Sequence, residues 1–336
     1  MSTPTNQRRA KLNDGHEIPV LGLGTYLSLP NEVTQAVVAG WKAGVRHFDC
    51  AQFYKNEKEV GAALAILSKE PGFKREDIFL TSKAWNSHHR PENIKKALSQ
   101  TLRDLGTDYI DLYLIHWPAN FAAIPDSSSP TGVALEPTAP NGDMLLDTEL
   151  SLVDTWRAFL DLKKDGLAKS VGVSNFTPTQ IELLIKGTGV TPAVNQVEAH
   201  PLLNQQALLT YCTPRGIHMT AYMPFGGDAA RGGNQVLGSP VVKEIADRLG
   251  KQPGQVLVSW AIRRGFSVLP KSVKPARIEA NFQAFDLGDE DYQKLVALGA
   301  KEPTRFGGLP YTFEPAWKVN VFDTPEERAA GLLEPF

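Results

Sequence analysis

Short runs of apolar and β-branched residues alternate along the chain with longer stretches in which apolar residues recur every three or four positions. The first pattern is typical of buried strands, and the second is typical of helices with one buried face. Strands are expected at residues 20–25, 45–49, 78–83, 109–116, 170–174, 193–197, 217–222 and 267–270. Helices are expected at residues 32–43, 57–68, 91–104, 148–164, 178–185, 203–212, 240–249, 253–264, 275–282 and 290–300.

Eight strand–helix repeats at even spacing predict an α/β fold of the (β/α)8 TIM barrel type, in which parallel strands close into one barrel. The alternative is an open, doubly wound sheet, but no change in composition divides the chain. We therefore expect a single barrel domain over residues 1–336. It is expected to begin with an N-terminal β-hairpin at residues 11–19, because Asn13-Asp14-Gly15 is a favoured turn sequence.

Two segments depart from the repeat. Residues 118–147, after the fourth strand, are rich in Pro, Ser, Ala and Gly and lack helical periodicity. Long loops of this kind are usually lids or disordered insertions, and we expect a lid-like loop. Residues 303–336 form a C-terminal tail whose prolines argue against a regular helix, and we expect it to lie extended over the barrel mouth. Its aromatic residues, too many for a solvated segment, include Phe306, Tyr311, Phe313, Trp317 and Phe322.

Composition excludes several classes of partner. The chain has 336 residues, of which 42% are hydrophobic, and this is enough to bury a large core. Its 35 basic residues balance 37 acidic ones, so that the formal net charge of −2 gives no electrostatic basis for binding nucleic acid. The two cysteines, Cys50 and Cys212, cannot form a disulfide framework, which suits the reducing cytoplasm.

No targeting or membrane segment is recognised in the sequence. Residues 1–11 are polar and lack the apolar centre of a signal peptide. No apolar run approaches the roughly 20 residues of a membrane span. We therefore expect a cytoplasmic protein with neither a membrane nor a nucleic-acid partner. No heptad repeat is visible, and a monomer is the expectation.

Polar residues follow the expected strands at their carboxyl ends. In a barrel of parallel strands these ends meet at one rim, where active sites of this architecture lie. Taken singly, an Asp after a strand is usually a helix cap, and an interior His is usually a core residue. The residues at the predicted rim are Asp49, Lys83, His116, Ser174, Asn175, Gln196, Tyr222, Lys271 and Ser272.

A carboxylate and a phenol flank the exit of the second strand, at Asp49 and Tyr54. An interior ammonium at Lys83 needs a counter-ion, and Asp49 on the neighbouring strand is the obvious one. The ammonium would also lower the pKa of the Tyr54 phenol, which is about 10 when unperturbed. With His116 beside them, these residues predict a site that can protonate a developing alkoxide.

Three segments closely resemble the three signatures of the aldo-keto reductases, in the same order. They are residues 44–61 (GVRHFDCAQFYKNEKEVG), 169–176 (KSVGVSNF) and 269–278 (LPKSVKPARI). The resemblance runs from about Lys11 to about Ala300. Lys274 and the long loop after His116-Trp117-Pro118 look like the fungal branch of NADP-dependent glycerol dehydrogenases and aldehyde reductases.

The resemblance implies a barrel enzyme that reduces aldehydes or ketones to alcohols with NADPH, reversibly and without a metal ion. Tyr54 would be the general acid, Lys83 would tune it, Asp49 would pair with Lys83, and His116 would orient the carbonyl. Hydride would pass from the nicotinamide to the carbonyl carbon. Candidate substrates are glyceraldehyde, glycerol in the reverse direction, sugar aldehydes and aromatic aldehydes.

The resemblance also implies contacts to the cofactor and the substrate. The nicotinamide carboxamide would be held by Ser174, Asn175 and Gln196, and its ring would stack on Tyr222. Further cofactor contacts would come from Thr25, Pro224, Gly226, Val273 and Asn281. The substrate cleft would be lined by aromatic residues that are otherwise ordinary core packing: Tyr26, Trp85, Trp117 and Phe121.

Cofactor choice can also be argued from the residues themselves. Lys271, Ser272 and Arg277 place two cations and a hydroxyl after the eighth strand, where such barrels commonly bind phosphate. The 2′-phosphate of NADP is a suitable ligand. A Rossmann fingerprint is absent, because residues 22–27 lack its third glycine. The glycine-rich loop at residues 226–233 either covers the pyrophosphate or is a flexible connection.

Two other functions stay open. The first is a metal-dependent hydrolase on the same barrel, although no clustered His-x-His or Cys ligands are present. Its ligands would be drawn from His47, Asp49, His116 and His200. The second is a non-catalytic cofactor-binding module, and the intact set of rim residues that the reductase chemistry needs argues against it.

Overall fold

The computed structural model describes residues 3–29, 31–227, 233–300 and 302–335, and its strand order confirms the (β/α)8 barrel. Strands β3 to β10 are hydrogen-bonded in chain order in one eight-stranded sheet. The chain divides into two compact units. The first unit comprises residues 1–49, 62–79 and 196–307, and the second comprises residues 50–61, 80–195 and 308–336. A single domain over residues 1–336 stays a prediction.

The first unit holds both ends of the barrel sheet. Parallel bridges from Leu21 to Val268 and from Gly24 to Lys271 join the first strand to the last, as a closed barrel requires. Gly22 is needed at this junction, because a Cβ there would lie 2.8 Å from the imidazole of His47 on the next strand along the chain. The strands of this unit are β3 (Leu23–Gly24), β4 (His47–Asp49), the end of β8 (Val194–Glu198), β9 (His218–Tyr222) and β10 (Ser267–Leu269).

The helices of the first unit cover these strands. Helices α8 and α9 pack on each other, α9 also packs against β10, and α10 lies beside α1. The predicted hairpin is confirmed as the antiparallel pair β1 (Arg9–Lys11) and β2 (Glu17–Pro19). The sequence pattern did not predict the short helix α7. The helices are α1 (Glu32–Lys42), α6 (Gln206–Cys212), α7 (Gly233–Leu237), α8 (Pro240–Leu249), α9 (Pro253–Arg263), α10 (Pro275–Asn281) and α11 (Asp289–Ala297).

The second unit is built on three parallel strands, β5 (Phe79–Ala84), β6 (Ile110–Ile115) and β7 (Ala168–Ser174). In the register of β5 and β6, Lys83 lies opposite Leu114 and Ser82 lies opposite Tyr113. Side chains alternate between the two faces of a sheet. Lys83 therefore shares one face with Leu114 and, two residues further on, with His116, whereas Ser82 and Tyr113 share the other.

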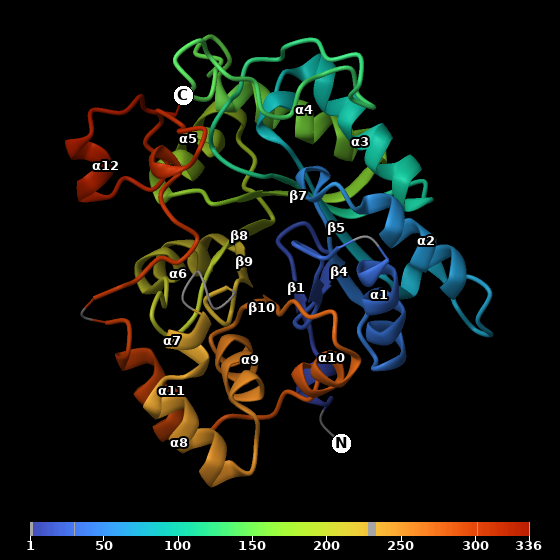
Figure 1. The fold of residues 1–336 in the computed structure, drawn as a ribbon, viewed down its shortest axis with the longest axis vertical. Coiled ribbons are helices and arrows are strands. Elements are labelled where there is room, and N and C mark those ends of the chain that lie inside the picture. The colour runs from blue at the N-terminus through green and yellow to red at the C-terminus, as the bar shows by residue number, and fades with distance from the viewer. Residues whose placement is uncertain (1–2, 30, 228–232, 301, 336) are drawn as a thin grey trace. The chain divides into compact units, whose positions relative to one another are not determined.

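Local signals explain where the helices of the second unit begin and end. Pro91 occupies the first position of α3, and Gly106 follows its last residue in the left-handed conformation. Thr177 and Gln180 form a capping box at the start of α5. Helices α3, α4 and α5 pack side by side (Figure 1). The helices are α2 (Glu57–Leu67, its first turn only), α3 (Pro91–Leu105), α4 (Leu152–Lys164), α5 (Pro178–Thr188) and α12 (Pro325–Ala329).

Residues 118–147 form a folded loop that packs against the C-terminal tail. The indole Nε1 of Trp85 donates a hydrogen bond to the carbonyl of Leu135 at 2.7 Å. The Met144 N–H donates to the carbonyl of Ala316 in the tail at 2.9 Å. That the loop acts as a lid stays a prediction. One buried cluster unites the segment just after β5, the loop and the tail through Trp85, Ala119, Phe121, Met144, Trp317, Val319 and Val321.

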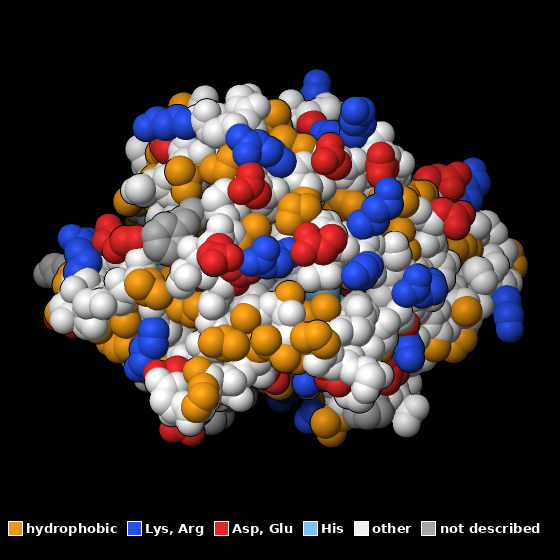
Figure 2. All heavy atoms as spheres, turned by 90° about the horizontal axis from the view of Figure 1, so that it is seen from above, with side chains coloured by type: hydrophobic (Ala, Val, Ile, Leu, Met, Phe, Trp, Pro, Cys, Tyr) orange, Lys and Arg blue, Asp and Glu red, His pale blue; other side chains and the backbone are white. Residues whose placement is uncertain are grey.

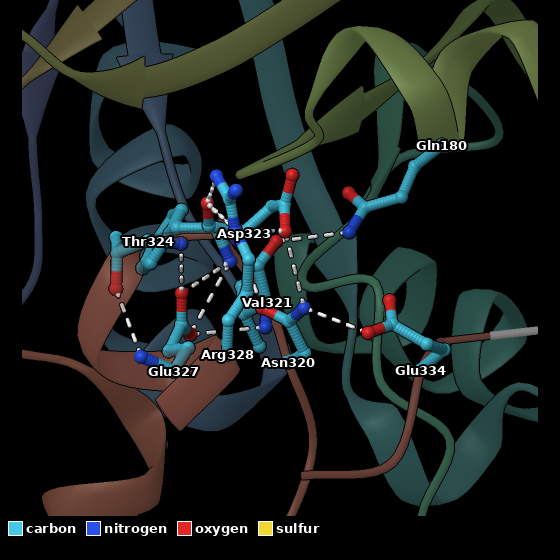
Figure 3. Close-up of polar contacts among 9 residues, drawn as sticks. Gln180, Asn320, Val321, Asp323, Thr324, Glu327, Arg328 and Glu334 are labelled. Atoms are coloured by element: carbon cyan, nitrogen blue, oxygen red, sulfur yellow. Dashed lines mark hydrogen bonds and ion pairs between the residues drawn. The ribbon is translucent and has the colours of Figure 1, made fainter. Parts of the chain in front are cut away.

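A buried carboxylate, Glu327, folds the end of the tail (Figure 3). It accepts hydrogen bonds from the backbone N–H groups of Val321 at 3.0 Å and Thr324 at 3.1 Å. The Thr324 hydroxyl accepts in turn from the Glu327 N–H, which completes a capping box for α12. The expectation of a tail without regular helix is wrong for this segment. Its Pro325 occupies the first helical position, where proline is favoured.

Surface charge, helix length and the state of the two cysteines bear on which partners the protein could have. Acidic and basic side chains are interspersed over the face shown in Figure 2, in line with the small net charge. Within the ranges that the structure describes, none of the helices combines the length and the apolar character needed to cross a membrane. Cys50 and Cys212 are both buried thiols.

Candidate active site

Lys83 and Tyr54 meet in the second unit. The Lys83 Nζ lies 3.2 Å from the Tyr54 Oη and donates a hydrogen bond to the Cys50 carbonyl at 2.8 Å. The Lys83 side chain is wholly buried. An ammonium group beside a phenol stabilises the phenolate and so lowers the phenol pKa. This pair can therefore release a proton more readily than an isolated tyrosine.

The backbone around Tyr54 explains its placement. Ala51 is extended, Gln52–Tyr54 form one 3-10 turn, and Lys55 adopts the left-handed conformation at φ 56°. Helix α2 then begins at Glu57, as predicted. The N–H of Cys50 donates a hydrogen bond to the Thr81 carbonyl of β5 at 2.8 Å. The turn that carries Tyr54 is thus hydrogen-bonded to β5 at its start and leads directly into α2 at its end.

His116 lies beside this pair. Its ring centroid is 5.9 Å from that of Tyr54 and 5.2 Å from that of Trp85, both edge-on. The pKa of His116 is held well below its usual value, mainly because the imidazole is buried and secondly because of the charges of Lys83 and His89. The imidazole is therefore neutral at neutral pH, and among the described residues its Nδ1 has no hydrogen-bond partner. A neutral imidazole can donate a hydrogen bond to a carbonyl oxygen.

Aromatic side chains surround His116. Trp85 meets Phe121 at a centroid distance of 5.9 Å and Trp317 at 5.7 Å, both edge-on. Trp117 meets Trp317 edge-on at 5.3 Å. Edge-to-face pairs at these distances are favourable beyond the apolar area that they bury. Three aromatic residues predicted for the substrate cleft are thus brought together, and a tail residue joins them.

Sequence reasoning missed two members of this aromatic wall, Phe53 and Trp317. The Phe53 ring stacks on Trp85 with centroids 3.8 Å apart. From the tail, Trp317 contacts the three wall residues that the sequence predicted, Trp85, Trp117 and Phe121. The position of Phe53 next to Tyr54 and the aromatic content of the tail were usable signals. Neither residue lies at the end of a strand, where site residues of this architecture are expected.

Ser174 is the last residue of β7 and Asn175 follows it, and both are buried. The Asn175 Nδ2 donates to the His116 carbonyl at 3.0 Å and lies 3.1 Å from the Ser174 Oγ. Asn175 has a φ of 66°, a left-handed conformation that asparagine tolerates better than most residues. The turn after β7 is therefore fastened to the backbone of the residue that carries the imidazole.

Asp49, Gln196 and Thr25 come together in the first unit. The Gln196 Nε2 donates a hydrogen bond to the Asp49 carboxylate at 2.8 Å. The Thr25 hydroxyl donates to the Asp49 carbonyl, also at 2.8 Å. All three residues are buried. Lys83 belongs to the second unit, and so its ion pair with Asp49 stays a prediction.

The residues predicted to bind phosphate lie in the first unit, between the end of β10 and α10. The side chains of Lys271 and Arg277 are exposed, and Ser272 is buried. The Lys271 Nζ donates to the Leu27 carbonyl at 2.9 Å. Two exposed cations and a hydroxyl within one short segment suit a phosphate group. The other cofactor residues predicted here are half-buried: Val273 and Asn281.

Tyr222 ends β9 in the first unit and is half-buried. Burial first, and then the negative charge of Glu198, raise the pKa of Tyr222. Pro224 and Gly226 follow in a turn that the Gly226 N–H closes with a 2.9 Å hydrogen bond. Gly226 has a φ of 78°, and a Cβ there would lie 2.6 Å from a neighbouring valine side chain, so that only glycine fits. Residues 228–232 of the predicted pyrophosphate loop lie outside the described residues.

These groups match the parts of NADPH in their chemistry. The two exposed cations suit a 2′-phosphate, and the side-chain amides of Asn175 and Gln196 can exchange hydrogen bonds with a carboxamide. The Tyr222 ring offers an apolar face for stacking. At Gly226 there is no room for a Cβ, which is typical of a position where the backbone approaches other groups closely. The donor set therefore fits the cofactor that the sequence implies.

The residues of the hydrolase alternative have other partners. In the first unit, the His200 Nε2 lies 3.0 Å from the Glu198 carboxylate, and the His47 ring packs edge-on against Phe79 at 4.9 Å. Over the part of the chain that is described, no group of three or more His, Cys, Asp or Glu side chains could hold a metal ion. Tyr26 is half-buried in the first unit, and its place in the substrate cleft stays a prediction.

Comparisons with known proteins agree with this chemistry. The model of the Aldo/keto reductase family matches residues 20–300. A D/L-glyceraldehyde reductase of Hypocrea jecorina is 45% identical over 332 residues, 96% of this chain and 97% of that protein. A glycerol 2-dehydrogenase (NADP(+)) of Saccharomyces cerevisiae is 43% identical over 288 residues, 84% of this chain and 88% of that protein. The solved aldose reductase of Schistosoma japonicum is 40% identical with a TM-score of 0.80, covering 92% of this chain and 100% of its own.

Proposed function

The chain belongs to the aldo/keto reductase family, and from that premise we propose that it reduces glyceraldehyde and related short hydroxyaldehydes to alcohols with NADPH. The broader activity, NADPH-dependent reduction of carbonyl groups, follows from the family and its NADP-dependent members. The observation that carries the proposed roles is the 3.2 Å contact between the Lys83 Nζ and the Tyr54 Oη, beside a neutral His116. Oxidation of glycerol with NADP⁺ is the reverse reaction.

The protein's own residues orient and protonate the substrate oxygen. When bound, NADPH supplies the hydride that adds to the carbonyl carbon. The Tyr54 Oη gives its proton to the developing alkoxide, and the Lys83 ammonium stabilises the phenolate that is left. His116 orients the carbonyl oxygen by donating a hydrogen bond. Asp49 is proposed as the counter-ion of Lys83, and in the oxidation direction the phenolate accepts the alcohol proton.

The remaining cofactor and substrate roles are proposed by the same chemistry. The carboxamide would be held by the amides of Asn175 and Gln196 with the Ser174 hydroxyl, and the ring would lie on Tyr222. The 2′-phosphate would be bound by Lys271, Ser272 and Arg277. Minor cofactor contacts would come from Thr25, Pro224, Gly226, Val273 and Asn281. The aromatic wall, with Tyr26 as a proposed member, would exclude water from the reacting carbonyl.

A panel of carbonyl compounds assayed with NADPH and with NADH tests the proposed function. We expect NADPH to be consumed with glyceraldehyde, with one glycerol formed for each NADPH, and more slowly with sugar and aromatic aldehydes. NADH should be a poorer donor. The absence of NADPH consumption with every carbonyl compound would refute the proposal, as would stoichiometric zinc in the purified protein together with hydrolase activity.

Lys271→Ala should weaken NADPH binding and leave NADH binding almost unchanged. Of the groups of the cofactor, the ammonium is proposed to contact the 2′-phosphate alone, and loss of a charge-assisted hydrogen bond costs about tenfold or more in affinity. Titration of protein fluorescence with each cofactor measures both dissociation constants. Lys274→Ala, an exposed lysine three residues on, is the matched control. Equal losses for the two cofactors would remove Lys271 from this role.

Trp317→Ala should impair the use of aromatic aldehydes more than cofactor binding. Trp317 packs against Trp85, Trp117 and Phe121, and removal of a large apolar surface from a pocket costs about tenfold or more in binding. The KM for benzaldehyde should therefore rise, with the dissociation constant of NADPH unchanged. Lys318→Ala, the exposed neighbour in the tail, is the control. A larger effect on NADPH than on the aldehyde would show that the tail is not part of the substrate cleft.

We also propose that the enzyme is a monomer of the cytoplasm. The two cysteines are buried thiols, as a reducing compartment favours. The sequence carries no heptad repeat that would direct a coiled-coil assembly. Light scattering of the purified protein measures the oligomeric state, and a mass of twice 36.8 kDa would contradict the monomer.

A further inference from the structure

Glu57 is a buried carboxylate that the proposed mechanism does not use. It stands at the first position of α2 and is only 5% exposed. Its two oxygens accept hydrogen bonds from the Ser82 Oγ at 2.5 Å and from the Thr101 Oγ1 at 2.8 Å. Ser82 belongs to β5 and Thr101 to α3. One side chain thus connects three elements of the second unit, and its hydrogen bonds offset part of the cost of burying a charge.

This bridge adjoins both members of the Tyr54–Lys83 pair. Glu57 follows Tyr54 by three residues, and Ser82 immediately precedes Lys83. Neighbouring residues of a strand point to opposite faces, so that Ser82 bonds Glu57 on one face of β5 while Lys83 meets Tyr54 on the other. The carboxylate therefore fastens α2, and the turn before it that carries Tyr54, to the strand that carries Lys83.

The contact between α2 and α3 leaves α2 little freedom to shift. One turn beyond Glu57, a Cβ on Gly61 would lie only 2.0 Å from the carbonyl oxygen of Asp104 on α3. Thr101 and Asp104 are likewise about one turn apart. The side-chain hydrogen bond and the close backbone approach are thus neighbouring contacts along the same pair of helices. Together they hold the first turn of α2 in place against α3.

Charged and titratable groups face Glu57 from each element around it. Burial raises the pKa of Glu57 to about 7, against the lowering effect of its two hydroxyl donors. Asp104 on α3 raises this pKa further, and Lys83 on β5 lowers it. On β6, burial and then the charge of Glu57 raise the pKa of Tyr113, whose Oη has no hydrogen-bond partner within the described residues. The hydrogen bonds that the Ser82 and Thr101 hydroxyl groups donate to Glu57 are therefore the contacts whose loss a substitution can test.

We propose that Glu57 is a positioning residue for the proton donor, because its bonds to Ser82 and Thr101 keep Tyr54 within hydrogen-bonding distance of Lys83. This inference rests on the proposed role of Tyr54 as the acid. Without the bridge, the turn that carries Tyr54 keeps its hydrogen bonds to β5 through Cys50, before Tyr54, but loses the tie after Tyr54, and its contact with the ammonium lengthens. The phenol pKa then rises toward its unperturbed value of about 10, and proton delivery slows. The two hydrogen bonds carry this effect, and the charge of the carboxylate is not required.

Two substitutions separate the hydrogen bonds from the charge. Glu57→Met keeps a similar volume and removes both acceptors. Glu57→Gln removes the charge, but its amide oxygen can accept from one hydroxyl and its NH₂ group can donate to the other. We expect Glu57→Met to lower kcat for glyceraldehyde reduction about ten- to a hundredfold, since a misplacement near 1 Å can cost this much. Glu57→Gln should stay within about threefold of wild type, because its bonds persist.

The pH profile distinguishes positioning from a general loss of structure. Reduction needs a protonated phenol, so kcat/KM falls at high pH as Tyr54 ionises. In Glu57→Met this fall should move to higher pH by about one unit, because the ammonium then acts more weakly on the phenol. The dissociation constant of NADPH should not change, and the number of sites per chain in the same titration reports the fraction of folded protein. Glu59→Gln, which alters a more exposed acid in the same turn of α2, is the control and should match wild type.

If Glu57→Met does not fold, Thr101→Val and Ser82→Ala each remove one of the two bonds. Each should lower kcat several-fold and move the high-pH fall in the same direction. Wild-type kcat in the folded variants, or a lower kcat with an unmoved pH profile, would overturn the proposal. Equal losses in Glu57→Gln and Glu57→Met would overturn it as well, because the charge would then be the cause. Failure of the proposed function differs from all of these outcomes, since the wild-type protein itself would then reduce no aldehyde.

Discussion

Tyr54→Phe is expected to reduce glyceraldehyde about 10² to 10⁴ times more slowly than wild type, the usual range for loss of a general acid. The substitution removes only the hydroxyl whose oxygen lies 3.2 Å from the Lys83 ammonium. The ring remains, and with it the edge-on contact to His116. Binding of NADPH should therefore be nearly unchanged. The oxidation of NADPH at saturating aldehyde measures the rate, and fluorescence titration measures the binding.

Tyr211→Phe is the matched control for this experiment. Tyr211 lies on α6 and has no proposed role in catalysis or binding, so removal of its hydroxyl should leave the rate and NADPH binding unchanged. Near-normal turnover in Tyr54→Phe would remove this residue from the role of proton donor. A rate loss with equal loss of NADPH binding would mean that the hydroxyl supports the cofactor instead.

Lys83→Met should lower kcat about a hundredfold and move the high-pH fall of kcat/KM upward by one unit or more. The wholly buried ammonium is the charge that favours the Tyr54 phenolate, and methionine replaces it with an apolar chain of similar length. Replacement of a buried charge by an apolar group is often tolerated by the fold. Initial rates from pH 6 to pH 11, with NADPH binding measured in parallel, give both quantities.

Lys58→Met provides the comparison, because Lys58 is exposed on α2 and close to Tyr54 in sequence. It should keep the wild-type rate and pH profile. A Lys83→Met enzyme whose rate falls while its profile stays in place would show that the lysine has a structural role only. The sign of the shift matters, since a fall at lower pH would mean that the ammonium had disfavoured the phenolate.

The barrel and most of its boundaries were predictable because local chemistry determines them. Proline at the first helical position and glycine after the last mark α3 and α8 in the sequence as clearly as in the structure. The expectation that site residues follow the strands selected Lys83 and His116, and the structure places both beside Tyr54. The short α12 escaped it, because its capping box, Thr324 with Glu327, lies among prolines that argue against a helix.

The parts that could not be predicted depend on contacts between segments far apart in the sequence. Nothing in the pattern around Trp317 indicates that it meets Trp117, since 200 residues separate them. Glu57 reads in the sequence as an ordinary acid in the first turn of a helix, where its charge suits the helix dipole. Only the structure shows that its carboxylate is buried and bonded to Ser82 and Thr101. Tertiary packing, rather than local propensity, decides the role of such residues.

The ionisation of Tyr54 is the sharpest test of its proposed role as the proton donor. The change in tyrosinate absorbance with pH, taken as the difference between wild type and Tyr54→Phe, isolates this one phenol and needs neither cofactor nor turnover. The account predicts that Tyr54 ionises at least about one unit below the unperturbed value near 10, and that Lys83→Met returns it toward that value. A Tyr54 that ionises at 10 or above in the wild-type protein would contradict it.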